Sequence, residues 1–220
     1  MADIWLIRHG QAGEVMGDYD KLSELGFAQA RAAGARWRHL GAVTHVVSGA
    51  MRRHKETAAA FAETFGEMPA PVIDPRWNEF DHQAVIRAAL AAGLEPARGG
   101  GKAGFFSFFL AAMGRWADGA HDGDYPESYA AFCGRVTAGL TQIADGLAKG
   151  EQAVVFTSGG AISAVCRHLL GLDPQRAFRI NLVLVNTGVT RVRKGAGQLA
   201  LATLNAHPHF DDQPELLSMS

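Results

Sequence analysis

The chain has 220 residues, of which 48% are hydrophobic and 20% are charged. This composition is typical of a soluble globular protein and excludes a disordered or fibrous chain, and the length suits a single large α/β domain over residues 1–220. The formal net charge of -1 gives no overall field that would attract nucleic acid or an anionic membrane, so we expect neither as a partner.

The sequence carries no recognisable export signal or membrane span. Arg8 and His9 follow only a short apolar run, whereas a signal peptide has a basic start and a longer apolar stretch. The most apolar segment, residues 105–113, is far shorter than the roughly 20 residues of a membrane-spanning helix. Cys133 and Cys166 lie in predicted helices without metal or redox spacing, and we expect both cysteines to be reduced and to serve in packing. A cytoplasmic location is therefore expected.

The first third of the chain alternates between predicted strands and helices. Apolar runs typical of buried strands cover residues 4–7, 43–47 and 71–73. Ser23 is placed to cap a helix that continues through Trp37, and a second helix is expected at about residues 51–65. This alternation is typical of parallel strands joined by helices.

The pattern loosens over about residues 81–126, which we interpret as an insertion between core elements. Gly99-Gly100-Gly101 makes a flexible break. The apolar residues that recur at helical spacing after it are Phe105, Phe108, Phe109, Ala112, Met113 and Trp116. We expect this face to pack inward, and the alternatives are a lid over a pocket or a contact in a homodimer.

The remaining elements complete an α/β pattern. Helices are expected at residues 129–147 and 161–170, a buried strand at 153–157, and closing strands at 182–186, 190–193 and 199–204. The whole order predicts a three-layer α/β/α sandwich with a mostly parallel central sheet. In such folds ligands bind beyond the carboxyl ends of the strands.

Three turns follow predicted buried strands and are expected to meet at that edge. They are Arg8-His9-Gly10-Gln11, residues 48–53 and residues 157–160. Arginine offers a planar fork of donors that matches phosphate oxygens, and helix N-termini add oriented N–H groups. The three turns together therefore predict a phosphate site.

His9 is the candidate nucleophile of this site. A lone histidine is more often a core residue, but burying it beside Arg8 without obvious partners would be costly. A neutral imidazole nitrogen attacks phosphorus, and neighbouring positive charge disfavours protonation of the ring. We therefore interpret His9 as functional.

Five segments, in chain order, carry a common signature: Arg8-His9-Gly10-Gln11; residues 22–26 with Gln29-Ala30; residues 48–58; Trp77-Asn78-Glu79; and residues 127–129 with Arg135-Val136. Together they resemble the histidine phosphatase superfamily, branch 1, which has the phosphoglycerate mutase-like fold. The resemblance covers most of the chain, except the insertion and the residues after about 205.

The resemblance implies roles for individual residues. His9 would take the phosphoryl group, and Arg8 and Arg53 would grip its oxygens. Arg53 falls in register when Thr57-Ala58 is aligned with the family's Thr-Ala pair. Glu79 would protonate the leaving oxygen and later assist a water molecule, with a surface salt bridge as its alternative role. The implied phosphate-binding set is completed by Ser158, Gln11 and Gly159.

Ser158 departs from the family pattern, which has a histidine at this position. Serine is shorter and supplies no positive charge, so the rate deficit is expected to be on the order of a hundred- to a thousand-fold. Three other histidines are open as compensating residues. His54 would point roughly 100° away from Arg53 around its helix, and His82 and His121 would reach the site only if the insertion folds over it.

The function that these residues favour is a phosphomonoester hydrolase with a phosphohistidine intermediate, without metal or cofactor, acting on a small phosphorylated substrate. The alternatives are a protein that binds phosphate or a phosphoester without turnover, and thirdly a phosphoglycerate-type mutase. Gly10, Gly13 and Gly17 have the wrong spacing for a dinucleotide-binding turn. A metal site at His207 and His209 is less expected than a polar tail.

Overall fold

The computed structural model describes residues 1–13, 20–97 and 99–219. Its helices and strands are β1 (Ala2–Arg8), α1 (Glu24–Trp37), β2 (His45–Ser48), α2 (Arg52–Phe65), β3 (Val72–Ile73), α3 (His82–Ala91), α4 (Gly101–Ala117), α5 (Tyr129–Gly146), β4 (Gln152–Thr157), α6 (Gly159–Leu170), α7 (Pro174–Val183), β5 (Val189–Lys194) and β6 (Leu199–Ala206). Single 3₁₀ turns add Pro75–Trp77, Asp122–Asp124, Pro208–Phe210 and Pro214–Leu216.

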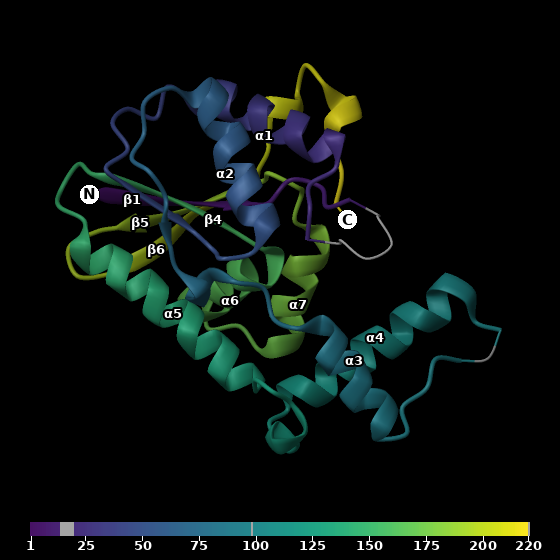
Figure 1. Ribbon diagram of the computed structural model, residues 1–220. Coiled ribbons are helices and arrows are strands. Elements are labelled where there is room, and N and C mark those ends of the chain that lie inside the picture. Colours follow the sequence, from purple (N-terminus) through teal and green to yellow (C-terminus); the bar gives the residue numbers. More distant parts are fainter. Residues whose placement is uncertain (14–19, 98, 220) are drawn as a thin grey trace.

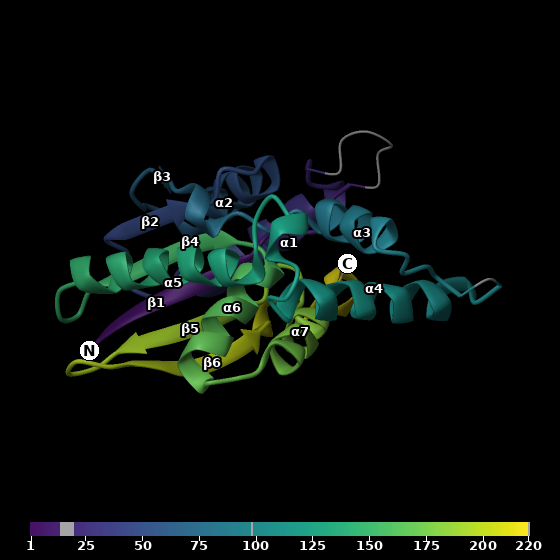
Figure 2. The ribbon, with the colours of Figure 1, turned by 90° about the horizontal axis from the view of Figure 1, so that it is seen from below.

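In the described part of the chain, six strands form one sheet in the order β3-β2-β4-β1-β5-β6. The pairs from β3 to β1 are parallel, and β5 and β6 are added antiparallel. Helices α1 and α2 lie on one face, and α5, α6 and α7 lie on the other (Figures 1 and 2). The predicted three-layer α/β/α fold with a mostly parallel sheet is confirmed.

Strand β1 is buried on both faces, which explains its unbroken apolar sequence. Ile4 and Leu6 belong to the larger core cluster, which includes α5 and α6 residues. Trp5 and Ile7 point to the other side and pack in a second cluster with residues of α1 and α2. Because successive strand residues face opposite sides, an apolar run is what a strand between two helical layers requires.

Helix α4 packs through one face only. Phe108, Ala112, Met113 and Trp116 belong to the larger core cluster. Phe105 is exposed, so the prediction of inward packing is confirmed for these four residues and is wrong for Phe105. The helical spacing identified the stripe, but its first residue lies beyond the edge of the core.

The predicted strand at residues 182–186 is wrong, because Leu182 and Val183 form the last turn of α7. Asp173 caps this helix by accepting a hydrogen bond from the Arg176 N–H. Pro174 occupies the first turn, where a backbone N–H would have no partner within the helix, so the N–H that proline lacks is not missed. A short apolar run does not distinguish a strand from a helix end, whereas this start signal does.

Two other local predictions, on the Ser23 cap and on the two cysteines, are confirmed. Ser23 caps α1 by accepting a hydrogen bond from the Gly26 N–H at 3.0 Å. Cys133 and Cys166 are both buried and free. Among the described helices, none is long and apolar enough to cross a membrane.

The packing of α4 gives a matched test. Met113→Ala removes a side chain that is 1% exposed, and we expect a loss of about 2–5 kcal/mol in the free energy of unfolding because a cavity is left. Phe106→Ala removes a larger side chain that is 45% exposed, and we expect a change within about 0.5 kcal/mol. Urea denaturation of both variants measures this; equal losses would show that the two helix faces are packed alike.

Candidate active site

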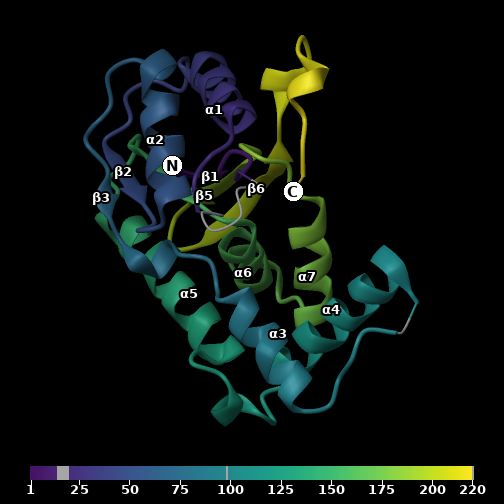
Figure 3. The same ribbon diagram turned by 45° about the vertical axis from the view of Figure 1, so that its right-hand side comes forward.

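Strands β1, β4 and β2 end at one edge of the sheet. The register pairs Arg8 with Thr157 and Ser48 with Phe156, so the three turns that follow start side by side. Figure 3 turns this side of the molecule toward the viewer, with α2 on one side of the strand ends and α6 and α7 on the other. The predicted convergence of the three turns is therefore present.

His9 is held rigidly at the first of these turns. The backbone N–H of His9 donates to the carbonyl of Thr157 at 2.8 Å, and the backbone carbonyl of His9 accepts from Nδ2 of Asn186 at 3.2 Å. The ring Nδ1 lies 2.8 Å from the carbonyl oxygen of Gly10. Because a carbonyl only accepts, Nδ1 carries the hydrogen, and the lone pair of the neutral ring is on Nε2.

The surroundings of His9 favour this neutral form. The side chain is buried, and burial is the largest cause that lowers the pKa of His9 well below its ordinary value. The charges of Arg53 and Arg8 lower it further, followed by that of His54, while the bond to Gly10 acts in the opposite direction. At neutral pH the ring is therefore an uncharged base among cationic groups.

The two predicted phosphate-binding arginines approach His9 from different elements. Arg53, on α2, is 5% exposed and pairs through Nη1 with Oδ1 of Asp20 at 2.8 Å. Arg8 donates through Nη1 to the carbonyls of Leu184 and, at 3.1 Å, Met219. The side chain of Asp20 thus lies at the site as an anionic partner of Arg53, a role that no sequence motif indicated.

Arg52, the residue before Arg53, lies at the periphery of the site. Its side chain is about half exposed and pairs with Glu56 one helical turn later at 2.6 Å. Its backbone N–H donates to Oδ2 of Asp20 at 2.7 Å. Asp20 therefore ties the first turn of α2 to the segment before α1.

Ser158 is the N-cap residue of α6, but its side chain does not cap that helix. The fully buried hydroxyl instead lies 2.6 Å from Nε2 of His54. The next residue, Gly159, is closely surrounded by side chains. A Cβ at this position would lie 2.1 Å from Oδ1 of Asn181 and 3.6 Å from Nε of Arg8. Asn181 of α7 is a second neighbour of the site that the sequence did not reveal.

His54, which the sequence left open as a compensating residue, lies beside His9. Its ring centroid lies 5.8 Å from that of His9, and the side chain is fully buried. The first turn of α2 abuts the ends of β1 and β4, so two residues 100° apart on the helix both reach site groups. Arg53 reaches Asp20, while His54 reaches Ser158. His82 begins α3, and His121 is exposed after α4.

Glu79 lies against the start of α6. Its Oε2 accepts from the N–H of Gly160 at 3.0 Å, and Oε1 accepts from the N–H of Phe80 at 3.2 Å. A Cβ on Gly160 would lie 2.0 Å from Oε1 of Glu79, so only glycine admits the carboxylate here. The approach joins the acidic segment to the third turn.

Arg135 of α5 holds the segment that carries Glu79 through hydrogen bonds to its backbone. Its Nη1 donates to the carbonyls of Arg76 and Asn78, at 2.7 and 2.8 Å. Its other nitrogens pair with the carboxylate of Glu127 at 2.7 and 3.0 Å. This explains why Glu127 and Arg135 form part of the signature although neither is a predicted site residue.

Gln11 has a structural role in the part of the chain that is described. Its Oε1 accepts from the hydroxyl of Ser23 at 2.8 Å, and its N–H donates to Oε1 of Gln29 at 2.8 Å. Both contacts tie the first turn to α1. The predicted role of Gln11 in phosphate binding stays a prediction.

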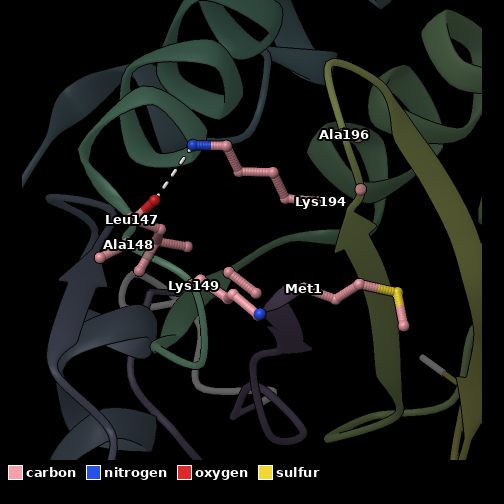
Figure 4. A pocket seen from close by; sticks show the side chains of 8 residues that line it. Met1, Leu147, Ala148, Lys149, Lys194 and Ala196 are labelled. Atoms are coloured by element: carbon pink, nitrogen blue, oxygen red, sulfur yellow. Dashed lines mark hydrogen bonds between the residues drawn. The ribbon is translucent and has the colours of Figure 1, made fainter.

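A hollow of about 350 Å³ lies at the other end of β1, beside Met1 (Figure 4). Lys194 extends across it, but its ammonium group donates to the carbonyls of Ala144 and Leu147 at 2.6 and 3.0 Å. This lysine stabilises the C-terminal end of α5. We therefore place no anion site there.

The tail also has an identifiable packing role. His209 is buried, and its Nε2 lies 3.0 Å from the hydroxyl of Thr187. Phe210 beside it is buried as well, so these residues anchor the tail. Within the described ranges, no group of three or more histidine, cysteine, aspartate or glutamate side chains is placed to hold a metal ion.

Three buried histidines make stability depend on pH. Burial is the main cause that lowers the pKa of His9, His54 and His209, the last to about 4. In the unfolded chain these rings take up protons below about pH 6.5, so the unfolded state then binds more protons than the folded state. The free energy of unfolding is therefore expected to fall as the pH is lowered from about 7 to about 5.

Replacing one of these histidines tests the cause. His209→Gln keeps a hydrogen-bonding side chain opposite Thr187 but removes the titration, so the slope of unfolding free energy against pH should decrease by about one proton. The exposed His39→Gln serves as the control and should leave the slope unchanged. Urea titrations across this pH range measure both, and equal slopes for His209→Gln and the parent would contradict the assignment.

Comparisons with known proteins agree with this arrangement. Residues 4–97 and 105–207 match the histidine phosphatase superfamily (branch 1). The chain is 23% identical to a mycobacterial glucosyl-3-phosphoglycerate phosphatase, with 93% of this chain and 98% of that chain covered and a TM-score of 0.66. It is 19% identical to a phosphoserine phosphatase from Entamoeba histolytica in complex with 3-phosphoglyceric acid, with 95% and 99% covered and a TM-score of 0.66.

These structural similarities show a shared fold, and no match is found among curated proteins. The family match spans both the turn that holds His9 and the turn that holds Ser158. The chain belongs to the histidine phosphatase superfamily, branch 1.

Proposed function

We propose that the protein is a phosphomonoester hydrolase that works through a phosphohistidine on Nε2 of His9. The observation that carries this proposal is the bond from Nδ1 of His9 to the Gly10 carbonyl, which leaves Nε2 as the basic nitrogen. Burial, helped by the charges of Arg53 and Arg8, lowers the pKa of His9 and keeps the ring neutral, and the same two charges attract a phosphate dianion. The phosphatase names of the structural neighbours support the same class of reaction.

In the first proposed step, Nε2 of His9 attacks phosphorus and the bond from phosphorus to the ester oxygen breaks. The leaving oxygen takes a proton from the carboxyl group of Glu79, so an alcohol and phosphohistidine result. Arg8 and Arg53 neutralise charge on the phosphoryl oxygens as the group moves. Small phosphorylated metabolites are the proposed substrate class.

In the second step, a water molecule attacks phosphohistidine. Glu79, now a carboxylate, takes a proton from that water, the bond from Nε2 to phosphorus breaks, and inorganic phosphate leaves. Both His9 and Glu79 then return to their starting states. Glu79 suits this role because its contacts with Gly160 and Phe80 hold it at the start of α6.

Phosphate binding without turnover is the second candidate function. Arg53 is paired with Asp20, and Arg8 donates to the carbonyls of Leu184 and Met219. These contacts occupy donors that a phosphoryl transfer needs, and Ser158 is a weaker phosphate ligand than the family's histidine. Turnover would require the substrate oxygens to replace some of these acceptors.

Phosphate release separates the two functions. Purified protein should release phosphate from a panel of small phosphomonoesters, and His9→Ala should abolish that release because it removes the nitrogen that takes the group. His39→Ala, on an exposed residue, is the matched histidine control and should keep the parental rate. Equal release from the parent and His9→Ala would rule out the hydrolase, whereas phosphate binding without release would favour the second function.

The role of Glu79 depends on the leaving group. Glu79→Gln keeps an oxygen that accepts from Gly160 but cannot deliver a proton, so kcat for an alkyl phosphate should fall by about a hundred- to ten-thousand-fold. The loss should be much smaller for 4-nitrophenyl phosphate, whose leaving oxygen needs little protonation. Equal losses for the two esters, measured by stopped assays of phosphate release, would argue against Glu79 as the acid.

A further inference from the structure

Two buried polar groups beside His9 are joined by a short hydrogen bond that the sequence did not suggest. Nε2 of His54, on α2, lies 2.6 Å from the hydroxyl of Ser158, at the start of α6. Both side chains are fully buried, and the His54 ring lies 5.8 Å from the His9 ring. The pair therefore joins the second turn of the site to the third.

We propose that His54 is a positioning residue that acts through Ser158, and that the two together replace the histidine that the family has at position 158. In this arrangement Nε2–H of His54 donates to the Ser158 hydroxyl, whose own hydrogen is directed to a phosphoryl oxygen. This inference rests on the proposed function. It concerns how the phosphoryl group is stabilised rather than whether His9 receives it.

The conformation of Ser158 is the first support. A serine at the N-cap ordinarily accepts a hydrogen bond from the N–H groups of its own helix. The backbone of Ser158 is extended as in a cap, yet its hydroxyl makes no capping bond and faces His54 instead. The side chain is thus diverted from stabilising α6 toward a group in the site.

The second support is the environment of the other ring nitrogen. Nδ1 of His54 is buried, and it has no hydrogen-bond partner among the described residues. A Cβ on Gly49 would lie 2.2 Å from this nitrogen, so the ring packs closely against the backbone of a residue that has no side chain. Burying a polar atom without a partner reduces stability, so the contribution of His54 to folding does not explain its position.

A bound phosphoryl group selects between the two hydrogen positions of the pair. Either Ser158 donates to Nε2, or Nε2–H donates to the hydroxyl oxygen. An anion near Ser158 favours the second, because the hydroxyl then donates to the anion in a charge-assisted bond. Donation from His54 to the hydroxyl oxygen polarises the O–H group and strengthens that bond.

The same contact limits substitution at position 158. Since the Ser158 hydroxyl is already 2.6 Å from Nε2 of His54, an imidazole at position 158 has no space in this direction while His54 is present. Ser158→His alone should therefore not raise activity. Combining Ser158→His with His54→Ala removes the imidazole on α2 and introduces one at position 158, which lies on the other side of the contact.

The test compares kcat and KM for the phosphomonoester that the parent cleaves fastest. His54→Ala and Ser158→Ala should each lower kcat by about ten- to a hundred-fold with little change in KM, and the double variant should be no slower than either single one. His54→Gln, whose amide can donate to Ser158, should recover most of the rate. The swap, His54→Ala with Ser158→His, should be faster than either substitution alone.

Several results would overturn the pairing. They are a parental kcat in His54→Ala, losses that multiply in the double variant, or a swap that is no faster than its single components. Thermal melts of each variant show whether it is folded, and His39→Ala controls for the loss of a histidine. Failure of the proposed function gives a different result, namely phosphate release from the parent equal to that from His9→Ala.

Binding of inorganic phosphate tests the pair even without turnover. In the parent protein with ¹⁵N-labelled histidine, phosphate should shift the Nε2 resonance of His54 toward the value of a protonated nitrogen, and Ser158→Ala should remove that shift. Phosphate that shifts the His9 resonances and leaves those of His54 unchanged would contradict the inference.

Discussion

The chemistry proposed for this protein depends on one hydrogen bond within a tight turn. The carbonyl of Gly10 accepts from Nδ1 of His9, and this fixes which nitrogen is a base. Without that bond the buried ring could place its hydrogen on either nitrogen. Burial is the main cause that lowers the pKa of this ring, and the charges of Arg53 and Arg8 lower it further, so the ring stays uncharged at neutral pH while the two arginines attract an anion.

The rest of the fold holds this turn in place. The backbone N–H of His9 donates to the carbonyl of Thr157 on β4, so the proposed nucleophile is tied to the neighbouring parallel strand. Arg53 and His54 come from the first turn of α2, and Ser158 comes from the start of α6. Arg135 holds the segment with Glu79 from the outer layer. Three layers thus contribute to a site that no single motif contains.

Much of this arrangement could be predicted from the sequence because it depends on short-range patterns. The apolar run of β1, the cap at Ser23 and the turns after the strands are local features, and parallel topology brings such turns together. The end of α7 was misassigned because its apolar residues also suit a strand. The cap at Asp173 followed by Pro174 is the local signal that identifies this segment as a helix, whereas the apolar run does not distinguish the two structures.

The missed neighbours of the site have a different cause. The sequence left open whether His54 reaches the site, because the angle between two helix positions does not show how a site is arranged around the helix end. Asp20 and Asn181 contribute from segments outside the signature, and their positions depend on how distant elements pack. Side-chain contacts across such distances follow from tertiary structure and leave no local pattern.

The central claim is that Nε2 of His9 carries the phosphoryl group during turnover. Rapid alkaline quenching during hydrolysis of a ³²P-labelled phosphomonoester, followed by peptide mapping and NMR of the labelled histidine, measures this directly. The account expects the label on Nε2 of His9. Label on Nδ1, on another residue, or on no residue during active turnover would contradict it.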